Sequence, residues 1–267
     1  MLSANGNDLH VERRGSGEPL LLVQGMTGHS LHWGETFLAA LEDDFELVLY
    51  DHRGVGRSAP SDGEFTIADL AADALAVLDG LDIDSAHVLG ISMGGMVAQE
   101  LALAAPERVR TLTLGATYCG GPGARFTDET VVNALASAIL SGDAERKIRA
   151  GWQFNVSPDF ATADGNFERF TEVAEQYPIA LGMIIAQVQA IMGHDTSARL
   201  AQISAPTLVV HGSADQMLVS ANGEIVADLI PGARLELLDG VGHLFFWEQP
   251  ERSAQLVREH AAAAAQA

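Results

Sequence analysis

The most informative segment of this 267-residue chain is the hexapeptide Gly90-Ile91-Ser92-Met93-Gly94-Gly95. The apolar run 86–89 before it predicts a strand, and the small-residue segment 94–105 after it predicts a helix. A serine in so sharp a strand-to-helix turn needs small residues two positions before and after it, because larger side chains would clash. Gly90 and Gly94 meet that requirement. The segment therefore predicts a serine hydroxyl held above the edge of a sheet.

Short apolar runs alternate along the chain with longer segments of helical periodicity, which is typical of parallel βαβ units. Runs such as Leu20-Leu21-Leu22-Val23 and Thr207-Leu208-Val209-Val210 are apolar on both faces, as expected of strands covered by helices on each side. The predicted fold class is α/β, with a mostly parallel central sheet and helices on both faces. Strands are predicted at 8–13, 19–24, 46–50, 86–89, 110–114, 206–211 and 234–237, and a further helix at 67–81.

This alternation stops over residues 119–203, where the pattern becomes helical and richer in aromatic residues. The turn-forming cluster Gly120-Gly121-Pro122-Gly123 opens the segment. We therefore predict a core domain formed by residues 1–118 and 204–267, with residues 119–203 inserted as a helical cap. Long insertions commonly take part in binding, so the cap is expected to lie over a pocket. A peripheral helical decoration without substrate contact is the alternative.

A nucleophilic serine needs a base, and histidine is the side chain best suited to accept its proton. Of the nine histidines, His243 follows a predicted strand in a flexible turn, at the sheet edge where catalytic groups collect. Asp215 also follows a predicted strand, and a carboxylate there would hold the histidine tautomer. Asp239 is the alternative, but its place in the same turn as His243 suits a turn former. The predicted triad is Ser92, Asp215 and His243.

An oxyanion hole needs two hydrogen-bond donors aimed at the oxygen that becomes negative. Ser92 is predicted to begin a helix, where the free amide of Met93 and the helix dipole favour negative charge. The loop Gln24-Gly25-Met26-Thr27-Gly28, which follows the strand predicted at 19–24, is the natural source of a second donor. The backbone N–H groups of Met26 and Met93 are therefore the predicted oxyanion donors.

Acidic residues outnumber basic residues by 36 to 15, which gives a net charge of −21. Such a charge repels phosphate backbones and anionic lipids, so neither nucleic acid nor a membrane is expected as a partner. The single cysteine, Cys119, cannot form an internal disulfide, and residues 1–8 lack the profile of a secretion signal. We expect a cytoplasmic monomer or homodimer. His29 and His32 are close in sequence, but no third metal ligand accompanies them, so neither a metal nor a cofactor is expected.

These residues together resemble the α/β-hydrolase family over nearly the whole chain outside the insertion. The segment 91–96 looks like that of the 3-oxoadipate enol-lactonases and the cofactor-free haloperoxidase-esterases, and some aromatic polyketide methylesterases are also similar. Many relatives carry His-Gly at the position of Gln24-Gly25. Carbon–carbon hydrolases usually carry asparagine at the position of Ile91, which argues against that branch. The other segments that carry the resemblance are 51–58, 105–109, 211–215 and 242–243.

The predicted function is that of a carboxylic ester hydrolase, which cleaves a small hydrophobic ester or lactone through an acyl-Ser92 intermediate. Trp152, Phe154, Tyr177 and Met183 of the insertion are predicted to contact the substrate, although packing within the cap explains such residues equally well. Two alternatives remain open. One is a cofactor-free haloperoxidase, perhydrolase or lyase on the same fold, and the other is a small-molecule receptor with slow turnover.

Overall fold

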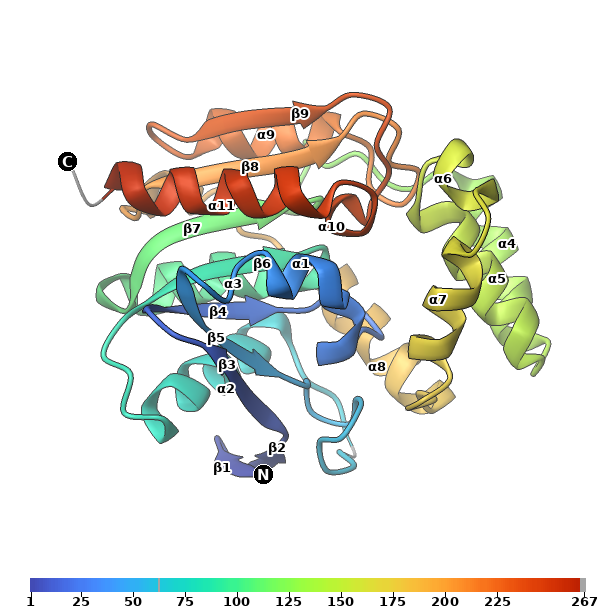
Figure 1. The fold of residues 1–267 in the computed structure, drawn as a ribbon, viewed down its shortest axis with the longest axis horizontal. Coiled ribbons are helices and arrows are strands. Elements are labelled where there is room, and N and C mark those ends of the chain that lie inside the picture. The colour runs from blue at the N-terminus through green and yellow to red at the C-terminus, as the bar shows by residue number, and fades with distance from the viewer. Residues whose placement is uncertain (62, 265–267) are drawn as a thin grey trace.

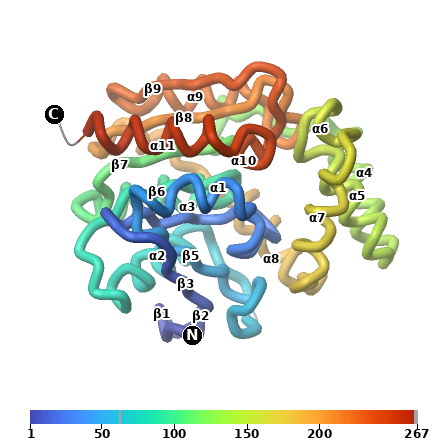
Figure 2. Tube along the Cα trace, viewed as in Figure 1, coloured from blue at the N-terminus to red at the C-terminus, as the bar shows by residue number. Residues whose placement is uncertain are grey.

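The computed structural model describes residues 1–61 and 63–264, and Figures 1 and 2 show their arrangement. The strands are β1 (Leu2–Ala4), β2 (Asn7–Leu9), β3 (Val11–Gly15), β4 (Glu18–Val23), β5 (Phe45–Tyr50), β6 (Ala86–Ile91), β7 (Val109–Gly115), β8 (Thr207–Gly212) and β9 (Arg234–Leu238). Within the described residues, seven of them form one sheet in the order β3-β5-β4-β6-β7-β8-β9. In this sheet β3 runs antiparallel to β5, and the other neighbours are parallel. The predicted α/β class is confirmed.

The N-terminal prediction of one strand over 8–13 is wrong. The chain instead forms β2, which pairs with β1 in a separate hairpin, and β3, which joins the main sheet. The break lies at His10, whose backbone N–H donates to Ser58 Oγ at 2.9 Å and whose carbonyl accepts from the Asp51 amide at 3.0 Å. Because the amide of His10 is bonded to this distant hydroxyl, His10 separates the two ladders, and an apolar alternation that is continuous in the sequence is divided between two sheets.

Helices cover both faces of the main sheet. Along β4, Leu21 and Val23 belong to an apolar cluster on one face, whereas Leu20 and Leu22 belong to a second cluster on the other face. This alternation follows from the two-residue period of a strand. Each fully buried leucine contributes about 1.5–3 kcal/mol relative to an exposed one. The helices of the core are α1 (Glu35–Ala39), α2 (Ile67–Gly80), α3 (Met93–Ala104), α9 (Ala221–Leu229), α10 (Phe245–Glu248) and α11 (Pro250–Ala264), with 3-10 turns η1 (Ser30–Trp33), η2 (Pro106–Arg108) and η3 (Leu200–Gln202).

The two clusters assign the helices to the two faces. Residues of α2, α3 and α9 contribute to the cluster that contains Leu21, and residues of α1, α10 and α11 contribute to the cluster that contains Leu20. Figure 1 shows α11 and α1 in front of the sheet, with α2 and α3 behind it. The sheet is thus shielded on both sides, as its continuous apolar strands require.

Residues 119–203 contain helices and no strand. The helices are α4 (Glu129–Leu140), α5 (Ala144–Asn155), α6 (Pro158–Thr162), α7 (Asn166–Ala174) and α8 (Leu181–Met192). Three of them begin at a side-chain N-cap, because Asp128, Asp143 and Ser157 each accept a hydrogen bond from a backbone N–H of the first turn. Figure 1 shows α4 to α7 beyond the arrowheads of β8 and β9, at the carboxyl end of these strands. The division into core and cap at 119 and 203 stays a prediction.

Helix length and hydropathy bear on membrane insertion. Over the described part of the chain, we find no helix that combines the length and the apolar character needed to cross a bilayer.

Candidate active site

Ser92 lies between β6 and α3 in a strained backbone conformation, with φ 56° and ψ −122°. Its backbone N–H donates to Gly115 O at 2.9 Å, and its carbonyl accepts from Thr117 Oγ1 at 2.7 Å, so the neighbouring strand end holds the turn. A Cβ added to Gly94 would lie 2.1 Å from Val23 O, and one added to Gly90 would lie 2.2 Å from Gly94 O. The two glycines are therefore required by close backbone contacts on both sides of the serine.

We expect Gly94→Ala to lower the free energy of unfolding by about 1–3 kcal/mol, because its methyl group would meet the backbone rather than a movable side chain. Gly182→Ala is the matched control, since an added Cβ there has no heavy atom within 4 Å and alanine is favoured over glycine within a helix. Urea unfolding of both variants measures the difference. Equal midpoints for Gly94→Ala and the wild type would contradict the close contact.

Asp215 and His243 lie together after β8 and β9. The distance from His243 Nδ1 to Asp215 Oδ2 is 2.7 Å, and both side chains are buried. Asp215 Oδ1 accepts hydrogen bonds from the Met217 and Leu218 amides at 2.8 and 2.9 Å. Burial by itself would raise the pKa of Asp215, but the adjacent His243 and hydrogen bonds from the neighbouring imidazoles lower it to about 2. Asp215 is therefore a carboxylate at neutral pH, held so that one oxygen faces the histidine.

Two residues near this pair were not singled out by sequence reasoning. His211 Nε2 lies 3.2 Å from Asp215 Oδ2 and 2.6 Å from Leu218 O. Glu248 Oε1 accepts from the Gly242 amide at 2.8 Å and from the Ser157 amide at 2.9 Å. Glu248 thus links the turn before His243 to Ser157, at the start of α6. The last position of a predicted strand marked His211, but nothing local in the sequence marked Glu248.

The candidate residues gather at one edge of the sheet. Because β4, β6, β8 and β9 run parallel, their carboxyl ends meet at that edge, followed by the loop 24–28, Ser92, Asp215 and His243 respectively. The loop runs beside the serine, since a Cβ on Gly25 would lie 3.1 Å from Ser92 Cβ and 3.8 Å from its Oγ.

Each predicted oxyanion donor is the residue that follows one of the two residues in this contact. Met93 is the first residue of α3, so its amide has no acceptor one turn earlier in the helix. Within residues 1–61 and 63–264, neither the Met93 amide nor the Met26 amide has a hydrogen-bond partner. Both N–H groups are therefore available to an oxygen bound beside Ser92.

The four predicted substrate residues lie in different environments. Trp152 is 2% exposed in an aromatic cluster that also contains Trp247, and its Nε1 donates to Ala161 O at 3.1 Å. Tyr177 is half-buried, with its ring 5.3 Å from that of His29, and Met183 is buried against Gly54. Phe154 is half-buried. Trp152 thus packs both within segment 119–203 and against Trp247 beyond it. Tyr177 and Met183 contact the loops that contain His29 and Gly54.

His29 and His32, considered above as a metal pair, have ring centroids 4.0 Å apart. Burial lowers the pKa of both residues, and that of His32 falls to about 3, so both rings are neutral near pH 7. In the part of the chain that the structure describes, no three His, Cys, Asp or Glu side chains are grouped so that they could hold a metal ion.

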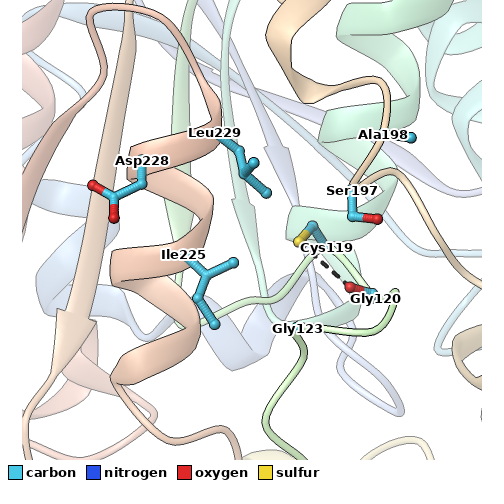
Figure 3. Close-up of a pocket in the computed structure, with 8 residues that line it drawn as sticks. All are labelled: Cys119, Gly120, Gly123, Ser197, Ala198, Ile225, Asp228 and Leu229. Atoms are coloured by element: carbon cyan, nitrogen blue, oxygen red, sulfur yellow. Dashed lines mark hydrogen bonds between the residues drawn. The ribbon is translucent and has the colours of Figure 1, made fainter.

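Two surface hollows lie away from these residues. One, of about 410 Å³, contains Cys119, whose thiol pKa is raised by burial (Figure 3). The other, of about 580 Å³, lies between α2 and the end of α8. Neither is lined by Ser92, Asp215 or His243. The first is lined by Cys119, Gly120, Gly123, Ser197, Ala198, Ile225, Asp228 and Leu229.

Comparison with known proteins identifies the family. The profile of the alpha/beta hydrolase fold matches residues 18–250. The chain belongs to the α/β-hydrolase fold family. This family assignment, predicted from the hexapeptide and the order of the triad residues, is confirmed, and it makes the chain a member of a hydrolase family.

Relatives of this α/β-hydrolase carry several names. It is 32% identical over 246 residues to a protein named carbamate hydrolase RutD from Azorhizobium caulinodans, with 91% of each chain covered. It is 29% identical to 3-oxoadipate enol-lactonase 1 of Acinetobacter baylyi, over 94% of this chain and 92% of the relative. A hydrolase structure from Pseudomonas aeruginosa matches with a TM-score of 0.83 and 30% identity, over 97% of this chain and 96% of the other.

Proposed function

We propose that this α/β-hydrolase cleaves a small carboxylic ester or lactone through an acyl-Ser92 intermediate. The observation that carries the proposal is the buried Asp215–His243 pair, with 2.7 Å between Oδ2 and Nδ1, at the same sheet edge as the strained turn of Ser92. A carboxylate that accepts the Nδ1 proton leaves Nε2 of the imidazole free to take a proton from a serine hydroxyl. The Met26 and Met93 amides, which have no partner among the described residues, supply the complementary donors.

In the proposed first half-reaction, Ser92 Oγ attacks the scissile carbonyl carbon as His243 Nε2 accepts the hydroxyl proton. The carbonyl oxygen becomes negative and accepts hydrogen bonds from the Met26 and Met93 amides. Collapse of this tetrahedral intermediate breaks the bond to the alcohol oxygen, which takes the proton from His243. The products are a free alcohol, or the opened end of a lactone, and acyl-Ser92.

The second half-reaction repeats these roles with water. His243 accepts a proton from water as the water oxygen attacks the acyl carbon, and it returns the proton to Ser92 Oγ as the acyl bond breaks. Asp215 stabilises the imidazolium that forms in each half-reaction and stays a carboxylate throughout. Its depressed pKa of about 2 supports this role.

For the substrate, we propose a hydrophobic group that contacts the insertion where it meets the core. Tyr177 and Met183 support this position, because both lie against loops of the core. Trp152 packs against Trp247 of α10, which lies close in the chain to His243. The similarity to a protein named as a carbamate hydrolase extends the substrates worth testing to carbamate esters, whose carbonyl carbon can be attacked in the same way.

The test combines a reactive probe with a substrate panel. A fluorophosphonate should add to the wild type at one site, and peptide mass spectrometry should locate the adduct on Ser92. The panel should contain chromogenic acyl esters of increasing chain length, small lactones and carbamate esters. A folded wild type that takes up no probe and hydrolyses no member of the panel would contradict the proposal. Repeating the panel with peroxide and halide tests for perhydrolase activity.

We expect kcat/KM to fall on the acid side with a limiting slope of one in a logarithmic plot against pH. A protonated histidine ring cannot accept the serine proton, so a single protonation stops the reaction. Asp215, with a pKa of about 2, stays charged over the pH range of the assay and adds no second protonation. Initial rates at low substrate concentration between about pH 4 and 8 measure the slope. A slope of two would contradict the depressed pKa of Asp215.

A further inference from the structure

Two glutamine side chains hold the loop that carries the Met26 amide. Gln24 Oε1 accepts from the Gly25 amide at 2.8 Å, and Gln187 Oε1 accepts from the Thr27 amide at 2.9 Å. Because both donors are backbone N–H groups, they fix which end of each side-chain amide is the oxygen. The amides on either side of Met26 are thus occupied, whereas the Met26 amide between them has no partner in the part of the chain that the structure describes.

Gln187 reaches this loop from the insertion. It lies on α8, 160 positions from Thr27 in the chain, and its side chain is fully buried. Its Nε2 atom has no partner within residues 1–61 and 63–264. Burying an amide with an unpaired N–H group destabilises the fold, and an apolar side chain at this position would avoid that loss of stability. The buried amide therefore suggests that the Oε1 contact has a role beyond filling space.

Thr27 is the residue of the loop that most needs such support. Its φ is 63°, in the left-handed region that a β-branched residue rarely adopts. The loop has one internal backbone bond, from the Gly28 amide to Gly25 O at 3.2 Å, which does not involve Thr27. Gln187 is the acceptor found for the Thr27 amide among the described residues. Without it, Thr27 would be free to leave the left-handed region and rotate the peptide that joins it to Met26.

We infer that Gln187 is a positioning residue, which holds the Met26 amide in place for the developing oxyanion through the Thr27 amide. This inference rests on the proposed function. It implies that the insertion does more than enclose a substrate. Because the acceptor is carried by α8, the oxyanion loop is fully ordered only while α8 is seated on the core.

The expected kinetic signature is specific. Removing an oxyanion donor outright typically lowers kcat by about 100- to 1000-fold. Losing only its support should have a smaller effect, so we expect kcat of Gln187→Met to fall about tenfold. KM should change by less than about twofold, because the oxyanion interaction is made in the transition state and little in the ground state.

The experiment compares four variants of the full chain by ester kinetics and by hydrogen–deuterium exchange of the peptide containing Thr27. Gln187→Met keeps the length of the side chain but removes the acceptor, and Gln187→Asn keeps an amide but withdraws it by one methylene. Gln187→Glu restores an acceptor oxygen. Gln189→Met is the matched control, since it makes the same change at an exposed position of the same helix. Circular dichroism melting verifies that each variant is folded.

We expect Gln187→Met and Gln187→Asn to speed exchange at Thr27 and lower kcat, with Gln189→Met unchanged in both. Gln187→Glu should retain slow exchange. Folded Gln187→Met or Gln187→Asn with wild-type kcat would overturn the positioning role, whether or not exchange changes. Slow exchange in both variants would overturn the hydrogen bond itself. A wild type that hydrolyses no ester would instead contradict the proposed function, which the wild-type assay reveals before any variant is compared.

Discussion

Replacing Ser92 with alanine is expected to lower kcat for ester hydrolysis by about 10⁴- to 10⁶-fold, the range seen when a serine nucleophile is removed. Alanine keeps the Cβ of serine, so the strained turn at φ 56° is retained. Ser92 Oγ makes no hydrogen bond within the described residues. The substitution should therefore remove the reacting atom without destabilising the fold. The melting temperature should stay within about 2 °C of the wild type, because a substitution that breaks no hydrogen bond and leaves no cavity changes the free energy of unfolding little.

The matched control for this substitution is Ser197→Ala. Ser197 lines the hollow of Figure 3, away from the triad, so its replacement should leave ester hydrolysis near the wild-type rate. Steady-state kinetics with one chromogenic ester compares the two variants. Full activity in Ser92→Ala would exclude an acyl-Ser92 intermediate. Loss of activity in Ser197→Ala would indicate that the hollow around Cys119 takes part in the reaction.

Asp215→Asn is expected to lower kcat by about 10⁴-fold, because an asparagine at this position of a triad holds the histidine in the wrong tautomer. The structure gives the reason in detail. The Met217 and Leu218 amides donate to Asp215 Oδ1, and an asparagine oxygen would keep those bonds. The asparagine Nδ2 would then face His243 Nδ1, force that nitrogen to accept, and put the ring proton on Nε2. The histidine could no longer take a proton from Ser92.

Asp239→Asn is the control for the charge change. Asp239 is exposed in the turn before His243, and its carboxylate contacts Ser213 Oγ at 3.2 Å. It was the alternative carboxylate in the sequence, but the structure pairs His243 with Asp215. We expect Asp239→Asn to retain kcat within about twofold, as is usual for exposed substitutions. Comparable losses in both variants would argue against a specific role for Asp215.

Asp215 also makes stability depend on pH. Its pKa is about 2 in the folded chain, below the unfolded value of about 3.9. A carboxyl group with a depressed pKa stabilises the fold above its unfolded pKa, and that contribution is lost as the pH falls toward 2. This loss is confined to pH values below about 4, so inactivation at milder acid pH should be reversible and should precede unfolding.

The sheet and the order of its candidate catalytic residues were predictable because their signals are local. Four residues of β7, 112–115, pair with neighbours on both sides, and the apolar pattern of such a strand is required wherever helices cover both faces. The requirement for Gly90 and Gly94 is likewise local, because both glycines lie within two residues of Ser92. Local rules failed at His10, because a distant hydroxyl, Ser58 Oγ, removes its amide from the ladder.

The contacts of individual side chains in residues 119–203 could not be predicted from local sequence patterns. Trp152 and Tyr177 have similar aromatic character in the sequence, yet Trp152 packs against Trp247 of α10 and Tyr177 packs against His29. Helical periodicity indicates which residues share a face of one helix, but not which other helix that face meets. That choice depends on how α4 to α8 pack together.

The sequence alone was therefore enough to predict the role of Ser92, because the glycines, the strand and the helix around it are adjacent in the chain. The pairing of His243 with Asp215 followed from chain order and the common edge of parallel strands. The contact of Gln187 with Thr27 was decided only by the tertiary structure, because a single hydrogen bond across 160 positions leaves no periodicity or turn signal in the sequence. It exists only where the packing of α8 brings a buried acceptor to one backbone amide.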